Sequence, residues 1–295
     1  MSEESLEHTV TWAELLEETT GLLRRAEIEN ASMEARWIVE QATGTTGSEF
    51  VEVLAAPASV RTVQHLDQMV ARRTAGEPIQ YVLGSWSFRS LDLMVDRRVL
   101  IPRPETEIVA GLAIAEIDRL HPDGGGVVID LGTGSGAIGL SIAAERAVER
   151  ALLTDASTDA LSVARANLAG LGMAGRAVEI SHGSWFEAVP DSLAGQIDVI
   201  VSNPPYVPTG DELPSAVLDW EPQSALLAGS DGLADLRIIV SESARWLRPE
   251  GALVLEMDPR QVSLVSESLR EAGFDVSVHR DLQGLERALV ARWIA

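Results

Sequence analysis

The segment VSNPPYVP, residues 201–208, carries the residues whose chemistry is easiest to interpret: Asn203, Pro204, Pro205 and Tyr206 directly follow an apolar run typical of a buried strand. Two prolines fix φ and cannot donate to a sheet, so the segment should leave the strand as a rigid turn. The Asn203 amide oxygen and the Pro204 carbonyl then form two fixed acceptors, and Tyr206 supplies a flat wall. This pattern predicts recognition of a planar NH2 group.

An amide or exocyclic amine is a poor nucleophile because its lone pair is delocalised. Acceptors that hold both N–H bonds let the nitrogen pyramidalise toward an electrophile, and they stabilise the positive charge that develops on it. No general base with a tuned pKa is required. We therefore expect methyl transfer, with residues 203–206 as the catalytic group.

A glycine-rich loop follows the strand VVID and reads LGTGSGAIG, residues 131–139. Alternating glycines allow a tight turn and a close approach of the backbone to a ligand. The candidate ligand-binding residues of this loop are Gly132, Thr133, Gly134, Ser135 and Gly136. Residues 134–139 also satisfy GxGxxG, which leaves NAD as an alternative ligand.

Two carboxylates flank this loop in the sequence. Asp155 ends the next strand, where it can accept both hydroxyls of a ribose, and this position fits either nucleotide. Asp130 stands just ahead of the loop and suits a cationic ligand better than a pyrophosphate. S-adenosylmethionine carries a ribose, an ammonium and a sulfonium but no phosphate, so we expect it to be the cofactor.

The elements that must position these loops begin near residue 127. Short apolar runs alternate with amphipathic helices, and the last two runs form a terminal strand pair; the runs are VVID, ALLTD, AVEIS, IDVIVS, ALVLEM, VSVHRD and ALVARW. This alternation predicts a mostly parallel sheet covered by helices on both faces. Ligands bind such sheets beyond the carboxyl ends of the strands, where the unusual loops lie.

Residues 1–75 have a helical pattern and predict a small bundle. Thr11 and Glu14 form a capping box at the start of the first helix. We expect Ser32 to cap a second helix, which ends at Gly44, and a third helix follows. No cluster of ionisable residues lies on an apolar face, so this domain is predicted to dock the substrate.

Residues 76–104 link the two domains. The stretch YVLGSWSFRSLDLMV alternates apolar and polar residues with a break at Arg89 and Ser90, which predicts a β-hairpin. Residues 105–295 then form the methyltransferase domain.

Composition excludes several kinds of chemistry. The 295 residues contain neither Cys nor Lys, which removes disulfides, thiolate catalysis and Schiff-base lysines. The five His residues are scattered without a metal-binding spacing, so we expect no metal site.

The net charge of −22 disfavours direct binding to nucleic acid. No apolar run is long enough to cross a membrane, and the first residues, MSEESLEHTV, are acidic where a secretory signal is basic. We expect a cytoplasmic monomer that binds no membrane.

The motifs together resemble one family. GEPIQYVLGSWSF, VLIPRPETE, VIDLGTGSGAIGLSIA, VSNPPYVP, EPQSALLAGSDGL and RDLQGLERALVAR are similar to the HemK/PrmC proteins, the glutamine N5-methyltransferases of bacterial peptide chain release factors. The resemblance extends from about Arg72 to the C-terminus. NPPY alone is shared with adenine-N6 DNA methyltransferases, whereas IPRPETE is typical of this family.

The resemblance implies a Rossmann-like class I S-adenosylmethionine-dependent methyltransferase domain. The cofactor would contact residues 132–136, Asp155, Trp185 and Asn203, and residues 203–206 would hold the glutamine of a Gly-Gly-Gln loop. The partner would be a class I release factor, docked by the helical domain. Two departures from the family pattern are Ser184, where an Asp is common, and residues 258–259, which replace a Gly-containing turn.

Other functions remain as alternatives. The NPPY segment also suits a glutamine methyltransferase of a ribosomal protein or an amino methyltransferase of nucleic-acid bases, although the acidity disfavours the latter. A non-catalytic scaffold could keep the same fold. An NAD oxidoreductase is disfavoured because the sequence offers no catalytic His or Tyr-Lys pair.

Overall fold

The computed structural model describes residues 10–294. The chain divides into two compact units, residues 1–84 and 85–295, and each has a hydrophobic core of its own. The acidic residues 1–9, on which the expectation of a missing secretory signal rests, lie outside the described part.

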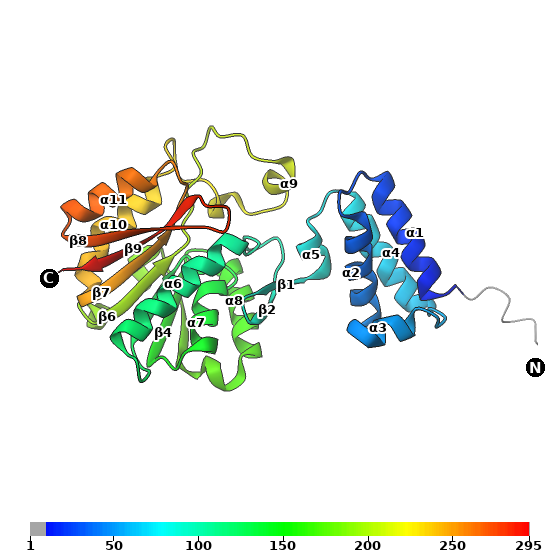
Figure 1. Ribbon diagram of the computed structural model, residues 1–295, viewed down its shortest axis with the longest axis horizontal. Helices are drawn as coiled ribbons and strands as arrows, with labels where there is room; N and C mark the ends of the chain where they lie inside the picture. Colours follow the sequence, from blue (N-terminus) through cyan, green and yellow to red (C-terminus); the bar gives the residue numbers. More distant parts are fainter. Residues whose placement is uncertain (1–9, 295) are drawn as a thin grey trace, which may run out of the picture. The chain divides into compact units, whose positions relative to one another are not determined.

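The first unit is a helical bundle (Figure 1). Its helices are α1 (Trp12–Arg25), α2 (Ala31–Thr43), α3 (Gly47–Val53), α4 (Val60–Thr74) and α5 (Ile79–Leu83). The capping box of Thr11 and Glu14 at the start of α1 is confirmed, and Gly44 ends α2 in the left-handed conformation as expected. Trp12, Leu23 and Ile38 are among the buried side chains that join these helices.

Some details of this bundle differ from the sequence prediction. Asn30, not Ser32, occupies the N-cap of α2, and the Ser32 hydroxyl accepts a hydrogen bond from Arg24 at 2.9 Å instead. Both residue types favour N-caps, so composition alone could not place this boundary. The short helices α3 and α5 were not expected, and α5 includes residues 81–83, the first three of the predicted hairpin stretch.

The second unit begins with this hairpin, which consists of β1 (Ser85–Phe88) and β2 (Leu91–Met94) in antiparallel pairing. The turn falls at Arg89 and Ser90, as predicted, and Arg89 adopts a positive φ of 52°.

A seven-stranded sheet forms the body of the second unit. Its order is β5-β4-β3-β6-β7-β9-β8, and β9 runs in the direction opposite to all the other strands. The strands are β3 (Val127–Leu131), β4 (Arg150–Asp155), β5 (Val178–His182), β6 (Ile197–Ser202), β7 (Leu247–Glu256), β8 (Phe274–Arg280) and β9 (Glu286–Trp293). The predicted mostly parallel sheet with a terminal antiparallel pair is confirmed.

Helices cover both faces of this sheet (Figure 1). One face packs against α6 (Pro104–Leu120), α7 (Ala137–Glu145) and α8 (Thr158–Gly170), and the other against α10 (Ala234–Trp246) and α11 (Val262–Glu271). Successive strand residues enter opposite cores: Val128 belongs to the first and Ile129 to the second. The strands are therefore buried on both sides, which explains their continuous apolar runs.

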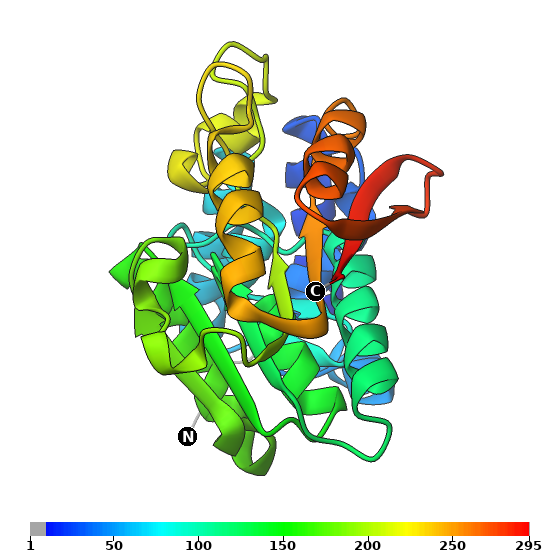
Figure 2. The same ribbon diagram turned by 90° about the vertical axis from the view of Figure 1, so that its left-hand side faces the viewer.

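The connections after β3, β4 and β6 lie at the carboxyl edge of the sheet, where the polar motifs were expected. Figure 2 shows the long segment after β6, in yellow-green and yellow, projecting beyond the strand; it contains α9 (Ser215–Leu218) and the 3-10 helix η5 (Gln223–Ala225). The other short 3-10 helices are η2 (Gly172–Ala177), η3 (Trp185–Ala188) and η4 (Asp191–Leu193). No helix within residues 10–294 has the length and apolarity needed to cross a membrane.

Candidate active site

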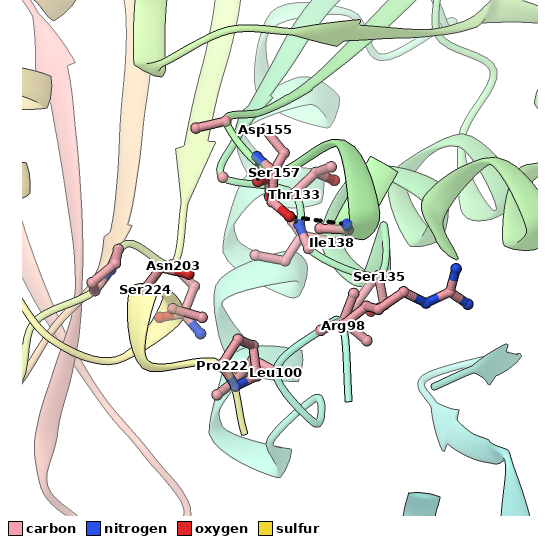
Figure 3. A pocket seen from close by; sticks show the side chains of 18 of the residues that line it. Arg98, Leu100, Thr133, Ser135, Ile138, Asp155, Ser157, Asn203, Pro222 and Ser224 are labelled. Atoms are coloured by element: carbon pink, nitrogen blue, oxygen red, sulfur yellow. Dashed lines mark hydrogen bonds between the residues drawn. The ribbon is translucent and has the colours of Figure 1, made fainter. Parts of the chain in front are cut away.

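A cavity of about 370 Å³ opens at the carboxyl edge of the sheet. The predicted site residues that line it are Gly132, Thr133, Gly134, Ser135, Asp155, Trp185, Asn203 and Pro205. Figure 3 shows Asn203 and Ser224 at one end of this cavity, apart from Thr133, Asp155 and Ser157. The glycine loop and the NPPY segment, separated by some 70 residues of sequence, thus face one space.

Trp185 forms an aromatic wall beside the glycine loop. Gly132 has a φ of +70°, and a Cβ there would lie 3.3 Å from the indole ring, so only glycine lets the ring approach the loop this closely. Trp185 itself has a positive φ of 46°, which is uncommon for a bulky residue. The close approach of the ring to the loop therefore depends on the backbone conformations of both residues.

Asp155 fixes the tip of the loop through its carboxylate. Oδ2 accepts from the Gly134 N–H at 2.9 Å, and Oδ1 accepts from the Ser157 N–H at 2.8 Å. Burial raises the pKa of Asp155, and these two backbone bonds oppose the rise. Each oxygen keeps a further lone pair, so the carboxylate fits the two hydroxyls of a ribose.

Asp130 lies beneath the loop and is not among the residues that line the cavity. Its Oδ2 accepts from the Thr133 hydroxyl at 2.6 Å and from the Gly139 N–H at 2.9 Å. Burial raises its pKa to about 6. Gly136 is also below the surface of the cavity, and a Cβ there would lie 2.6 Å from Leu140. Neither residue lines the cavity, and both shape the loop from behind.

Residues 203–206, the NPPY segment, follow β6 directly and are not part of a strand, as the two prolines predicted. The Nδ2 group of Asn203 donates to the Thr106 hydroxyl at 3.2 Å, while the Tyr206 hydroxyl donates to Glu256 Oε1 at 3.3 Å. Pro204 and Tyr206 are not among the cavity-lining residues. The Tyr206 ring packs against the sheet face covered by α10 and α11.

Glu256 is a site residue that the sequence analysis missed. It ends β7, its side chain is only 1% exposed, and burial raises its pKa to about 7. The Thr106 and Tyr206 hydroxyls and the Arg287 charge oppose that rise. A carboxylate within the apolar run ALVLEM was the available signal, because buried acids without a partner are rare.

The loop before α6 was also missed as part of the site. Arg98, Leu100 and Pro102 line the cavity together with Pro222 and Ser224 of the segment after β6, and Figure 3 shows Leu100 beside Pro222. Buried Glu221 joins the two loops, because it accepts from the Ile101 N–H at 3.1 Å and from the Arg103 guanidinium. This pair of loops narrows one side of the cavity.

The two positions that depart from the family pattern have defined roles. Ser184 lines the cavity and begins η3 with a capping box to Glu187. In the loop after β7, the Asp258 carboxylate accepts from the Arg260 N–H at 2.8 Å. Gln261 of the same loop donates to the Tyr206 carbonyl at 2.9 Å, so this loop supports the NPPY segment.

No cluster of three or more His, Asp or Glu side chains able to hold a metal ion occurs within residues 10–294. The polar side chains that line the cavity include the Asp155 and Asp235 carboxylates, the Asn203 amide, hydroxyls and the Arg98 guanidinium. These groups suit hydrogen bonding to an organic ligand.

Comparison with known proteins agrees with this geometry. Residues 14–84 match the family described as PrmC N-terminal domain, and residues 115–219 match the methyltransferase small domain. The chain is 36% identical to the release factor glutamine methyltransferase of Deinococcus radiodurans, over 95% of this chain and 97% of that one. It is 41% identical to the enzyme of the same name from Neisseria gonorrhoeae, over 78% of this chain and 82% of that one.

A methyltransferase from Pyrococcus furiosus shares the fold with a TM-score of 0.51 and 17% identity, over 78% of this chain and all of that one. This likeness supports the Rossmann-like methyltransferase architecture. Because full-length relatives exceed 30% identity, the chain belongs to the release factor glutamine methyltransferase family.

Proposed function

We propose that this protein transfers a methyl group from S-adenosylmethionine to the side-chain amide nitrogen of the glutamine in the Gly-Gly-Gln motif of a class I release factor. The observation that carries this proposal is the position of Asn203 in the same cavity as the glycine loop. An amide-binding group and a nucleoside-binding loop thus face one space, as transfer between their two ligands requires.

The residues around the loop fit S-adenosylmethionine. Asp155 would accept the ribose hydroxyls, Trp185 would lie against the adenine, and the backbone of Gly132 and Gly134 would approach the ligand. Asp130 would act through the loop, since it holds Thr133 and Gly139. When bound, this cofactor supplies an electrophilic methyl group on a sulfonium.

The NPPY segment would hold the glutamine. The Asn203 Oδ1 and the Pro204 carbonyl would each accept one N–H of the amide, and Tyr206, which packs behind the cavity, would support the segment. Fixed acceptors favour a pyramidal nitrogen and stabilise the charge that develops as the new N–C bond forms. The proton lost afterwards passes to solvent, so no base is needed within the cavity.

A protein substrate accounts for the remaining features. The first unit matches a domain named for this family and would dock the release factor away from the reacting glutamine. The net charge of −22 favours a protein partner over bare nucleic acid. We infer that the protein acts as a monomer in the cytoplasm, where termination of translation takes place.

Label transfer from S-adenosyl-methionine with a radioactive methyl group tests the proposal. A purified class I release factor, ribosomal proteins and stripped tRNA should be offered separately to the enzyme, and we expect label in the release factor alone. Label confined to ribosomal protein or RNA would redirect the proposal to another amino group. Tight cofactor binding without transfer to any of them would favour the scaffold alternative.

A further inference from the structure

The hairpin of β1 and β2 is tied to the glycine loop through the side chain of Asn167, which belongs to α8. The Asn167 Oδ1 accepts from the Met94 N–H at 2.7 Å, and its Nδ2 donates to the Met94 carbonyl at 3.1 Å. The same Nδ2 group also donates to the Ser135 carbonyl of the glycine loop at 2.8 Å. One buried amide thus connects the hairpin, α8 and the loop, which are distant from one another in the sequence.

These three bonds fix the orientation of the Asn167 amide. An amide has one acceptor oxygen and two N–H donors, and its partners here are one N–H and two carbonyls. Turning the amide over would place its oxygen against both carbonyls and its NH2 group against the Met94 N–H. The bonding pattern therefore requires an amide, because an ionised carboxylate cannot donate and an apolar side chain forms none of the three bonds.

The hairpin also holds the far end of α7, the helix that begins at the glycine loop. This helix follows Gly136 and ends at Glu145, whose carboxylate accepts two hydrogen bonds from the Arg89 guanidinium, at 2.8 and 2.7 Å. Arg89 occupies the turn of the hairpin. The start and the end of α7 are therefore both connected to one hairpin, the start through Asn167 and the end through Arg89.

The apolar face of the hairpin keeps it in place. Phe88 of β1 and Leu93 of β2 are fully buried and belong to the same hydrophobic core as Ile138 of α7. A two-stranded hairpin is marginally stable by itself, so this packing is what gives it a fixed position. A hairpin anchored in the core can in turn support the loop.

We propose that Asn167 is a positioning residue for the cofactor site, and that the β1–β2 hairpin supports the glycine loop in addition to linking the two units. Ser135 lines the cavity, so a shift of its peptide group changes the surface that the cofactor meets. Asn167 and Met94 are not among the cavity-lining residues and act through Ser135. The consequence for S-adenosylmethionine rests on the proposed function, whereas the support of the loop is a property of the free enzyme.

Calorimetric titration with S-adenosylmethionine, without release factor, measures this consequence. Asn167→Leu should raise the Kd about tenfold, because the buried Ser135 carbonyl loses a donor and the loop can shift. Asn167→Asp keeps the acceptor for the Met94 N–H but cannot donate when ionised, so it should raise the Kd by a similar factor. An unchanged Kd in both variants would contradict the proposal.

Ser87→Ala is the matched control within the hairpin. It removes an exposed hydrogen bond of 2.6 Å to Asp92 and leaves the bonds of Asn167 in place. We expect its Kd for S-adenosylmethionine to equal that of the wild type. A rise as large as that of Asn167→Leu would attribute the effect to general loosening of the hairpin and would overturn the role of the Asn167 amide.

Methyl transfer separates the positioning of the cofactor from a general loss of structure. At saturating S-adenosylmethionine, Asn167→Leu should keep kcat within about threefold of the wild type and leave the KM for release factor unchanged, because the NPPY segment is not touched. A kcat that falls as far as the affinity does would contradict a role confined to the cofactor.

Hydrogen–deuterium exchange of the free enzyme tests the support of the loop itself. The Thr133, Gly134 and Gly136 N–H groups are all hydrogen-bonded, and in Asn167→Leu we expect them to exchange about tenfold faster, with β7 unchanged. Unchanged exchange in the loop, or an equal increase in β7, would overturn the proposal. A wild-type enzyme that methylates no release factor would refute the proposed function alone, because exchange is measured without substrate or cofactor.

Discussion

The two ends of the cavity are built differently. At the glycine loop, carboxylates bind mainly backbone N–H groups: Asp155 holds Gly134 and Ser157, and Asp130 holds Gly139 as well as the Thr133 hydroxyl. At the NPPY segment, side chains bind side chains, from Asn203 to Thr106 and from Tyr206 to Glu256. Backbone partners have little freedom to move, whereas side-chain amides and hydroxyls can exchange donor and acceptor roles.

This difference has a consequence for function. The glycine loop is held through its backbone, so its affinity for the cofactor should depend mainly on backbone conformation and close packing. The NPPY segment is held by hydrogen bonds between side chains. Removing a single polar atom there should therefore lower kcat more than it lowers the affinity for the cofactor. Substitutions at the two ends should therefore separate cofactor affinity from turnover.

Removal of the amide at Asn203 should have the largest effect. We expect Asn203→Ala to reduce kcat by roughly 100- to 1000-fold, because one fixed acceptor for the developing charge is lost. Gln196→Ala is the matched control, since it removes an exposed amide just before the opposite end of the same strand, β6. Methyl transfer under saturating S-adenosylmethionine measures both; similar rates for the two variants would remove Asn203 from the mechanism.

Gly132→Ala should chiefly affect the end of the cavity formed by the glycine loop. A side chain at φ +70° is strained, and its Cβ would press on the Trp185 ring at 3.3 Å. We expect the Kd for S-adenosylmethionine, measured by calorimetry, to rise about tenfold. Gly170→Ala is the control, because a Cβ there meets nothing within 4 Å and its φ is not positive. An unchanged Kd for Gly132→Ala would show that the loop backbone does not set affinity.

Tyr206→Phe should have a smaller effect on turnover. The ring and its packing remain, but Glu256 loses one donor, which lies at 3.3 Å in the wild type. That hydroxyl lowers the pKa of Glu256, so its loss should raise that pKa. We expect a rate reduction of less than about tenfold at neutral pH. Methyl transfer under saturating S-adenosylmethionine measures the rate, and a loss as large as that of Asn203→Ala would contradict a supporting role for this hydroxyl.

Asp130→Asn should change stability more than chemistry, by about 1–3 kcal/mol. The folded-state pKa of about 6 lies above the ordinary value of 3.8, so the folded protein binds this proton more tightly than the unfolded chain. The ionised form therefore costs stability above pH about 6, and the cost disappears as the pH falls toward 3.8.

Urea unfolding of Asp130→Asn and wild type at pH about 5 and about 8 measures this effect. The variant should gain stability relative to wild type at the higher pH, and that gain should shrink at the lower pH. A stability difference independent of pH would mean that Asp130 does not titrate in the folded state.

Much of the second unit could be predicted from its sequence because its signals are local. The apolar runs predicted the strands. The glycine loop directly follows β3 in the chain, and the NPPY segment directly follows β6. Thr106 and Glu256 could not be found this way, because they lie 97 residues before Asn203 and 50 residues after Tyr206. Their meeting depends on the strand order, in which β7 pairs with β6, and on α6 packing against both.

The boundaries of the site show the same limit. Spacing indicated that Asp130 and Tyr206 belong to the site, but it could not reveal that neither lines the cavity. In the first unit, the capping box of α1 was recognised, yet Asn30 and not Ser32 is the N-cap of α2, and Ser32 accepts from Arg24 instead. Local patterns predicted which loops form the site, and tertiary packing determines which of their side chains line the cavity.

The most direct measurement is tandem mass spectrometry of a class I release factor incubated with the enzyme and S-adenosylmethionine. We expect one added methylene mass on the side chain of the Gly-Gly-Gln glutamine, lost with Asn203→Ala and kept with Gln196→Ala. A methyl group on any other residue, or modification that persists in Asn203→Ala, would contradict the proposal that the Asn203 amide holds the reacting nitrogen.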